Sequence, residues 1–197
     1  MAEDTQPLLL VLSGPSGVGK TTVALRLLEA NTDLVRAVTC TTREPRDGEE
    51  DGVDYHFLDN DAFLDRVRAG DFLEHAEVYG NRYGTLKSTV LEALTAGKDV
   101  LIVNDVQGAL TLGAMARRDP VLNRALSTMF LVVEDVAELR SRLKGRAADD
   151  NETIEERLTI AEAEMDQREQ FDHVIVSRTR EEDYEQAQAI YRKVKAN

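Results

Sequence analysis

The chain has 197 residues, of which 42% are hydrophobic and 31% are charged, as expected for one globular domain with or without insertions. Its formal net charge of −13 argues against a nucleic-acid-binding protein, because such proteins need a basic surface to replace counterions. No apolar run approaches the roughly 20 residues that cross a membrane, and the N-terminus lacks a basic targeting segment. A single cysteine, Cys40, suits a reducing compartment, so we expect a cytoplasmic protein.

The first predicted strand is the apolar run Leu8–Ser13, which ends at Gly14 and precedes helically spaced apolar residues over Thr21–Ala30. A continuous apolar run is typical of a strand buried on both faces. The same succession of strand and helix recurs at Asp99–Asn104, at Thr128–Val133, and at His173–Ser177 before Glu181–Val194. Alternating strands and helices predict an α/β fold, a phosphate-loop core of three layers with a parallel sheet. Residues Ala37–Thr41 are a candidate fifth strand.

Two stretches interrupt this alternation. Residues 39–87 contain short runs, Tyr55–Leu58 and Phe72–Tyr79, around a helical pattern at Asp61–Ala69, which predicts a small mixed or antiparallel β insertion. Residues 136–170 are nearly all helix formers with few large apolar side chains and a polar break at 147–151, so we expect a mobile helical lid rather than core. The remaining residues, 1–38, 88–135 and 171–197, form the predicted core.

A phosphate-binding loop is predicted between the first strand and the first helix. Its residues are Gly14, Pro15, Ser16, Gly17, Val18, Gly19, Lys20, Thr21 and Thr22, and they fit G-x-x-x-x-G-K-[ST]. Glycines let successive backbone N–H groups point at phosphate oxygens, and the helix N-terminus favours the same anion. We expect Lys20 to contact the β- and γ-phosphates of ATP and the Thr21 hydroxyl to bind Mg²⁺. A glycine-rich turn without a ligand would need none of these side chains.

Two arginines, Arg43 and Arg46, flank Pro45 in the next segment, and tyrosines and a glutamate follow. Here the sequence resembles the guanylate kinase family. The motifs that carry the resemblance stand in the family's order and cover nearly all of residues 8–194: GPSGVGKTT, TTREPRDGEEDGVDYHF, GDFLEHAEVYGNRYGT, NDVQGA and RLKGR. That order is far more specific than any one motif.

The resemblance implies a GMP-binding set of eight side chains. The 5′-phosphate would be held by two guanidinium groups, which match phosphate oxygens, and by two tyrosine hydroxyls. Two carboxylates would accept hydrogen bonds from the N1–H and 2-amino groups of guanine, which adenine lacks, and two threonines would complete the base pocket. The guanidinium groups are those of Arg43 and Arg46, and the hydroxyls are those of Tyr55 and Tyr83. The carboxylates are those of Glu74 and Asp105, and the threonines are Thr39 and Thr85.

The resemblance also assigns Arg142, Arg146 and Arg157 as catalytic arginines of the lid, which would neutralise the transferring phosphoryl group. Considered alone, helical arginines usually serve solvation or pair with an acid one turn away, as Glu138 would pair with Arg142. No general base is predicted, because the attacking oxygen belongs to a phosphate that is largely ionised at pH 7.

The sequence departs from the family pattern at two places. Val103 stands where the family has an aspartate that helps to hold hydrated Mg²⁺, and strand alternation predicts that Asn104 faces away from the site. We therefore expect Thr21, ATP oxygens and water to hold the metal, with Asp105 in the outer shell. Residues 177–179 read Ser-Arg-Thr where the family has Asn-Asp-Asp, which leaves the adenine contacts open.

The predicted reaction is the Mg²⁺-dependent transfer of the γ-phosphoryl group of ATP to GMP, and to dGMP, with a lid that closes over ATP. One alternative is a guanylate-kinase-like interaction domain without catalysis, although such domains have lost the lysine of the phosphate loop, which is retained here as Lys20. Another alternative is a related kinase acting on another nucleotide or a phosphorylated sugar. The predicted partners are small molecules only, with no nucleic acid and no membrane. The sequence leaves the choice between monomer and homo-oligomer open.

Overall fold

The core of the molecule is a parallel sheet, seen in a computed structural model that describes residues 6–78, 80–144 and 151–196. The sheet has the order β2-β7-β1-β8-β9 and every neighbouring pair is parallel. Its five strands are β1 (Leu9–Ser13), β2 (Leu34–Arg36), β7 (Asp99–Val103), β8 (Leu126–Val132) and β9 (His173–Val176). All five residues of β1 are buried, as the continuous apolar run predicts for a central strand covered on both faces.

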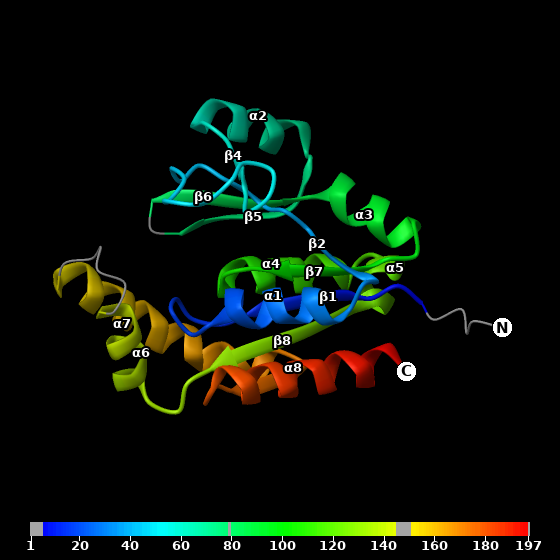
Figure 1. Ribbon diagram of the computed structural model, residues 1–197. Coiled ribbons are helices and arrows are strands. Elements are labelled where there is room, and N and C mark those ends of the chain that lie inside the picture. Colours follow the sequence, from blue (N-terminus) through cyan, green and yellow to red (C-terminus); the bar gives the residue numbers. More distant parts are fainter. Residues whose placement is uncertain (1–5, 79, 145–150, 197) are drawn as a thin grey trace.

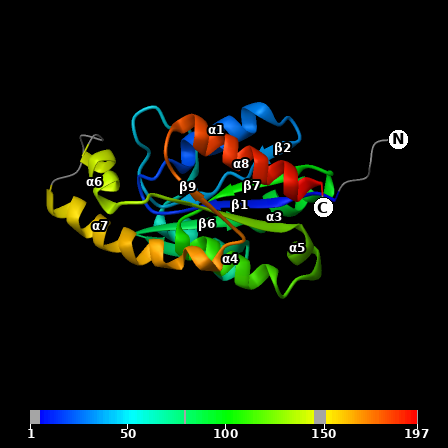
Figure 2. The ribbon, with the colours of Figure 1, turned by 90° about the horizontal axis from the view of Figure 1, so that it is seen from below.

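Helices cover both faces of this sheet, as Figures 1 and 2 show. Alternation along β1 sends Leu10 and Leu12 into one apolar cluster and Leu9 and Val11 into the other. The first cluster includes α1 (Lys20–Ala30) and α8 (Arg180–Lys195). The second includes three helices, α3 (Lys87–Thr95), α4 (Val106–Ala116) and α5 (Pro120–Ala125). The predicted α/β class with a parallel sheet is confirmed. No helix within the described ranges is long and apolar enough to cross a membrane.

The prediction that Ala37–Thr41 forms the fifth core strand is wrong. The fifth strand is β2, Leu34–Arg36, which pairs with β7 at the sheet edge. Cys40 and Thr41 form β3 and belong to a second sheet. The chain leaves the core sheet directly after β2, where the backbone N–H of Ala37 still donates to Leu101 O of β7 at 2.9 Å.

The second sheet is mixed, as predicted, and has the order β4-β3-β6-β5. It lies at the top of Figure 1. Strand β3 is parallel to β4 and antiparallel to β6, which is antiparallel to β5. The elements are β3 (Cys40–Thr41), β4 (His56–Phe57), β5 (Phe72–Val78), β6 (Asn81–Leu86) and the helix α2 (Asn60–Ala69). Phe63 of α2 and Phe72 of β5 stack on each other with ring centroids 4.6 Å apart. Strand β6 was not predicted, because Asn, Arg and Gly interrupt its apolar pattern.

The lid segment contains α6 (Val136–Lys144), α7 (Asn151–Met165) and a 3₁₀ helix, Asp166–Gln170. The segment was expected to be a lid rather than core, and part of it does belong to the core: Leu139, Leu158 and Ala161 are buried in the first core cluster. A few apolar side chains at helical spacing are enough to seat both helices. Most of the predicted polar break, residues 147–150, lies outside the described residues.

Candidate active site

The phosphate loop takes its shape from glycines and from close contact with strand β8. Gly14 has φ +143°, and a Cβ there would lie 2.1 Å from Leu131 O, so no other residue fits without moving β8. Gly19, with φ +119°, is the N-cap of α1, and the helix therefore directs its first N–H groups at the loop. Lys20 folds over the loop, where its Nζ donates to Gly14 O at 2.7 Å and to Pro15 O at 3.0 Å.

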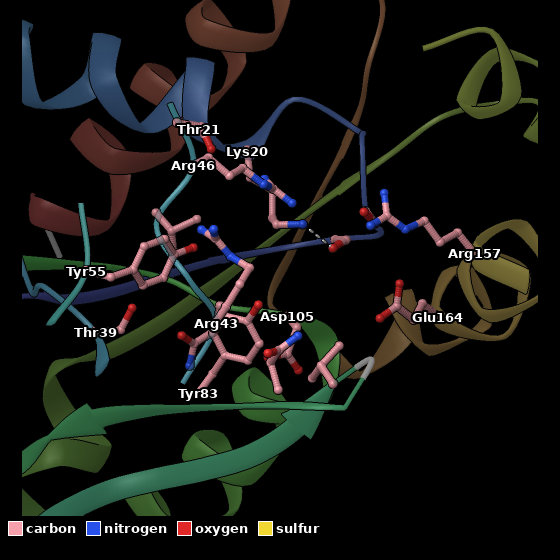
Figure 3. A pocket seen from close by; sticks show the side chains of 16 residues that line it. Lys20, Thr21, Thr39, Arg43, Arg46, Tyr55, Tyr83, Asp105, Arg157 and Glu164 are labelled. Atoms are coloured by element: carbon pink, nitrogen blue, oxygen red, sulfur yellow. Dashed lines mark hydrogen bonds between the residues drawn. The ribbon is translucent and has the colours of Figure 1, made fainter. Parts of the chain in front are cut away.

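A single cavity of about 210 Å³ joins this loop to the second sheet. Most of the predicted side chains for ATP and GMP meet here, together with five residues that were not predicted as ligands. Its lining residues are Gly14, Ser16, Lys20, Thr21, Thr39, Arg43, Arg46, Tyr55, Val78, Asn81, Tyr83, Val103, Asn104, Asp105, Arg157 and Glu164. Figure 3 shows Arg43 and Arg46 beside Lys20, with Arg157 and Glu164 reaching in from α7.

The basic end of the cavity is built around Arg43. Its Nη2 donates to both carboxylate oxygens of Glu49 at 2.9 Å, and its Nη1 donates to Glu44 O at 2.6 Å. It also lies 5.5 Å from the Tyr55 ring centroid, and the Tyr55 and Tyr83 rings meet edge to face at 6.1 Å. These contacts fix the guanidinium plane before any ligand arrives. A planar fork held in this way suits a phosphate dianion.

Two predicted base ligands, Glu74 and Thr85, do not line the cavity; Glu74 is 4% exposed and lies directly behind Asn104, which does line it. Glu74 Oε1 accepts hydrogen bonds from Thr85 Oγ1 at 2.7 Å and from Asn104 Nδ2 at 3.0 Å. Burial raises the pKa of Glu74, and the negative charge of Asp105 adds to this, whereas Thr85 and Asn104 oppose it. Asp105 itself caps α4, because its Oδ1 accepts from Gly108 N at 2.9 Å. Glu74 and Thr85 thus lie behind the residues that line the cavity.

The prediction that Asn104 faces away from the site is wrong. Strand β7 ends at Val103, and Asp105 already begins the turn into α4. Strand alternation therefore does not apply to residue 104, whose side chain contacts Glu74 and lines the same cavity as Val103 and Asp105. The pattern offered no signal for this, because the side-chain direction depends on where the strand stops.

The three predicted lid arginines do not share one location. Arg157 lines the cavity beside Lys20. Arg142 instead lies on the other side of the phosphate loop, where it donates to Val18 O at 2.6 Å and to Ser177 Oγ at 3.2 Å and pairs with Glu138. Arg146 lies outside the described residues. A second cavity of about 500 Å³ surrounds Arg142 and also takes in Gly17, Val18, Gly19 and Thr22, so the predicted ATP-binding residues border two cavities.

Glu164 is a site residue that the sequence did not reveal. It comes from α7, and its carboxylate faces the loop, where the Ser16 N–H donates to it and the Lys20 charge attracts it. Burial is the main cause that raises its pKa from 4.5 to about 7, and Asp105 adds to the shift. Its Oε2 is buried and has no hydrogen-bond partner within the described structure. One glutamate among many on an acidic helix carries no distinguishing pattern.

Comparison with known proteins agrees with this geometry. A family model described as guanylate kinase matches residues 6–194. The chain belongs to the guanylate kinase family. It is 47% identical over 186 residues to the guanylate kinase of Anaeromyxobacter dehalogenans, covering 94% of this chain and 80% of that protein. The guanylate kinase of Wolbachia pipientis is 39% identical, with 98% and 93% covered. The crystal structure of guanylate kinase from Anaplasma phagocytophilum superposes with a TM-score of 0.80 at 34% identity, covering 98% of this chain and 88% of that one.

The described residues of this guanylate kinase family member supply few side chains that could bind a metal ion. Among the described residues there is no group of three or more His, Cys, Asp or Glu side chains arranged to hold a metal ion. Thr21 and Asp105 line the same cavity, and Val103 adds only apolar wall. One hydroxyl and one carboxylate fit a Mg²⁺ ion that is held mainly by nucleotide phosphates and water. They would not form a cage of their own.

Proposed function

We propose that this chain is a guanylate kinase that transfers the γ-phosphoryl group of ATP to GMP, and more weakly to dGMP, giving ADP and the nucleoside diphosphate. The observation that carries the proposal is the single cavity in which the phosphate loop faces Arg43, Arg46 and the Asp105 carboxylate. Family membership supports the reaction, and the cavity gives each substrate a chemically distinct end. An oxygen of the GMP phosphate forms the new P–O bond, and the β–γ bridging oxygen leaves with ADP.

The donor phosphates bind at the loop in this proposal. The backbone N–H groups of residues 14–19 and the N-terminus of α1 surround the anion. Lys20 exchanges its bonds to Gly14 O and Pro15 O for the β- and γ-phosphate oxygens. The Ser16 N–H donates to the Glu164 carboxylate, and the incoming phosphate replaces that carboxylate as the acceptor. The cavity around Arg142, which Arg178 and Asp183 also line, is the proposed place for the donor base.

The acceptor phosphate binds between Arg43, Arg46 and the hydroxyls of Tyr55 and Tyr83. GMP must displace Glu49 from Nη2 of Arg43 to use both arms of the guanidinium, because both oxygens of Glu49 accept from that nitrogen. The exchange replaces one anion by another at the same guanidinium group. Arg43 therefore keeps a partner throughout the reaction cycle, which limits the free energy lost on desolvation.

The guanine base binds against Glu74 and Asp105, with Thr39 and Thr85 beside it. A carboxylate only accepts hydrogen bonds, so it pairs with the N1–H and 2-amino donors of guanine and opposes the N1 acceptor of adenine. Buried polar groups left without partners make such discrimination steep, up to 10⁴–10⁵ for a well-formed site. Glu74, at 4% exposure, meets that condition.

Phosphoryl transfer then depends on positioning and charge rather than on a general base, because the attacking phosphate oxygen is already ionised near pH 7. Lys20 and Arg157 are proposed to neutralise the transferring group, and the fit of Arg142 and Arg146 to that role depends on movement of the lid. The Thr21 hydroxyl is the proposed protein ligand of Mg²⁺, with Asp105 in the outer shell. When bound with ATP, the metal ion neutralises the phosphate charge.

The test is ADP formation from ATP and Mg²⁺ with GMP, dGMP, AMP, UMP and CMP measured in parallel. The proposal predicts rapid turnover with GMP, slower turnover with dGMP and rates near background with the other three. Binding of GMP without turnover would support the alternative of a non-catalytic interaction domain. Equal turnover with AMP would contradict the assignment of Glu74 and Asp105 to the base.

A further inference from the structure

Asn104 lines the cavity, although the sequence analysis gave it no role in the site. It is 8% exposed, and its backbone N–H donates to Leu12 O at 3.1 Å, so the central strand β1 fixes its main chain. Its side-chain Nδ2 donates to Glu74 Oε1 at 3.0 Å. An amide that is this deeply buried and this rigidly attached makes a directed hydrogen bond rather than a surface contact.

The bond links two elements that are distant in the sequence, since Asn104 follows a core strand and Glu74 lies on β5 of the second sheet. Thr85 Oγ1 donates to the same oxygen, Oε1, at 2.7 Å. Both side-chain donors thus hold one edge of the carboxylate, from the second sheet and from the core. With Oε1 fixed by two donors, the carboxylate plane is fixed as well.

The other carboxylate oxygen is confined by Gly108 at the start of α4. A Cβ on Gly108 would lie 3.0 Å from Glu74 Oε2 and 3.1 Å from Asn104 Nδ2. A methyl group there would press on both partners of the bond, so the close approach requires glycine. Glu74, Asn104 and Gly108 therefore form one packed unit in which the carboxylate has little freedom to rotate.

We propose that Asn104 is a positioning residue that determines specificity for guanine, because its amide orients the Glu74 carboxylate toward the N1–H and 2-amino edge of the base. The proposal rests on the proposed function, in which Glu74 reads the base. It also adds a requirement on charge. A protonated Glu74 would present an O–H donor to the guanine donors, so the site needs the carboxylate form, and Asn104 is one of two side-chain donors that favour it.

The experiment compares wild-type protein with Asn104→Leu, which has a similar volume but no donor, and with Asn104→Asp, which keeps the shape and adds a second carboxylate. The dissociation constants of GMP, IMP and ribose 5-phosphate are measured by titration calorimetry without ATP at pH 6 and pH 8. IMP lacks the 2-amino group, and ribose 5-phosphate lacks the base. The ratio of the ribose 5-phosphate and GMP constants isolates the contribution of guanine from that of the phosphate.

For Asn104→Leu we expect GMP binding to weaken about 10- to 100-fold, the usual effect of losing a hydrogen bond to a charged group. Ribose 5-phosphate binding should stay within about twofold. The preference for GMP over IMP should fall, and the loss should be no smaller at pH 6 than at pH 8, because removing a donor that favours the carboxylate raises the pKa of Glu74 further. For Asn104→Asp the guanine contribution should fall at least as far, because two carboxylates then face each other.

Gln188→Leu is the matched control for removing a buried amide. Gln188 is 6% exposed and exchanges two hydrogen bonds with Asn31, at 2.8 and 2.9 Å, away from the cavity. It should leave GMP binding unchanged. The inference is overturned if both Asn104 variants bind GMP as the wild type does, or if GMP and ribose 5-phosphate weaken together. A wild-type protein that fails to bind GMP would instead contradict the proposed function itself.

Discussion

Glu164 should make the stability of this protein fall as pH rises, and Glu164→Gln should remove that fall. The carboxyl is half-buried against the phosphate loop, where burial raises its pKa from 4.5 to about 7. The nearby Asp105 charge acts in the same direction, while Lys20 and the Ser16 N–H act against it. Its Oε2 is buried without a hydrogen-bond partner in the described part of the chain. At pH 8 the folded protein therefore carries an ionised carboxylate in an unfavourable place.

The sign and size follow from the two pKa values. Because the pKa is higher in the folded protein than in the unfolded chain, the unfolded chain releases this proton first. The contribution of Glu164 is fully present below about pH 4.5 and is lost as pH rises through about 7. Between pH 5 and pH 8 the loss is roughly 2 to 3 kcal/mol of unfolding free energy. For a chain of this length that corresponds to roughly 5 to 10 °C in Tm.

The assay is urea unfolding followed by circular dichroism, without nucleotide, at pH 5, 6, 7 and 8. The unfolding free energy of Glu164→Gln minus that of the wild type should rise by roughly 2 to 3 kcal/mol from pH 5 to pH 8. Glu162→Gln, on the exposed side of the same helix, is the control and should give a difference that does not vary with pH. Parallel pH profiles for the wild type and Glu164→Gln would refute the reasoning about burial at the loop.

Three other substitutions test separate parts of the account. Tyr191→Phe removes a hydroxyl that donates to the fully buried Asp99 at 2.6 Å and should lower the unfolding free energy by about 1.5 to 3 kcal/mol in urea titration; an unchanged midpoint would contradict this. Arg43→Lys should raise KM for GMP about 10- to 100-fold and leave KM for ATP unchanged, because a lysine cannot form the bidentate fork; equal changes in both constants would refute its placement. Val103→Asp should lower the Mg²⁺ concentration needed for half-maximal rate, and an unchanged Mg²⁺ requirement would contradict the account of the metal.

The central strands were predictable because burial on both faces is the single requirement that their side chains meet. Leu9–Ser13 is buried on both faces, so every residue is apolar or small and the pattern is unbroken. The edge strand β2 was missed because three residues, Leu34–Arg36, are too few to show a period. Strand β6 was missed because Arg82, which contacts Asn60 and Glu77, and Gly84, which packs on Phe72, interrupt the apolar pattern of a strand.

The site residues that belong to contiguous sequence motifs were predicted. Those whose place in the site depends on tertiary structure were not. The phosphate loop and the Arg43 segment are contiguous in sequence, and the structure places both at one cavity. Asn104 and Glu164 belong to the cavity because a strand ends and a helix packs at particular residues, which no spacing reveals. Arg142 has the expected motif, yet it donates to Val18 O and Ser177 Oγ on the other side of the loop.

The most direct test of the central claim follows the phosphorus itself. ³¹P NMR of the wild-type protein with ATP, GMP and Mg²⁺ distinguishes transfer to GMP from release of inorganic phosphate. The account predicts that ATP signals are replaced by those of ADP and GDP in equal amounts, with no free phosphate, and that Lys20→Met abolishes the change. Accumulation of inorganic phosphate without GDP would show hydrolysis instead of transfer and would contradict the account.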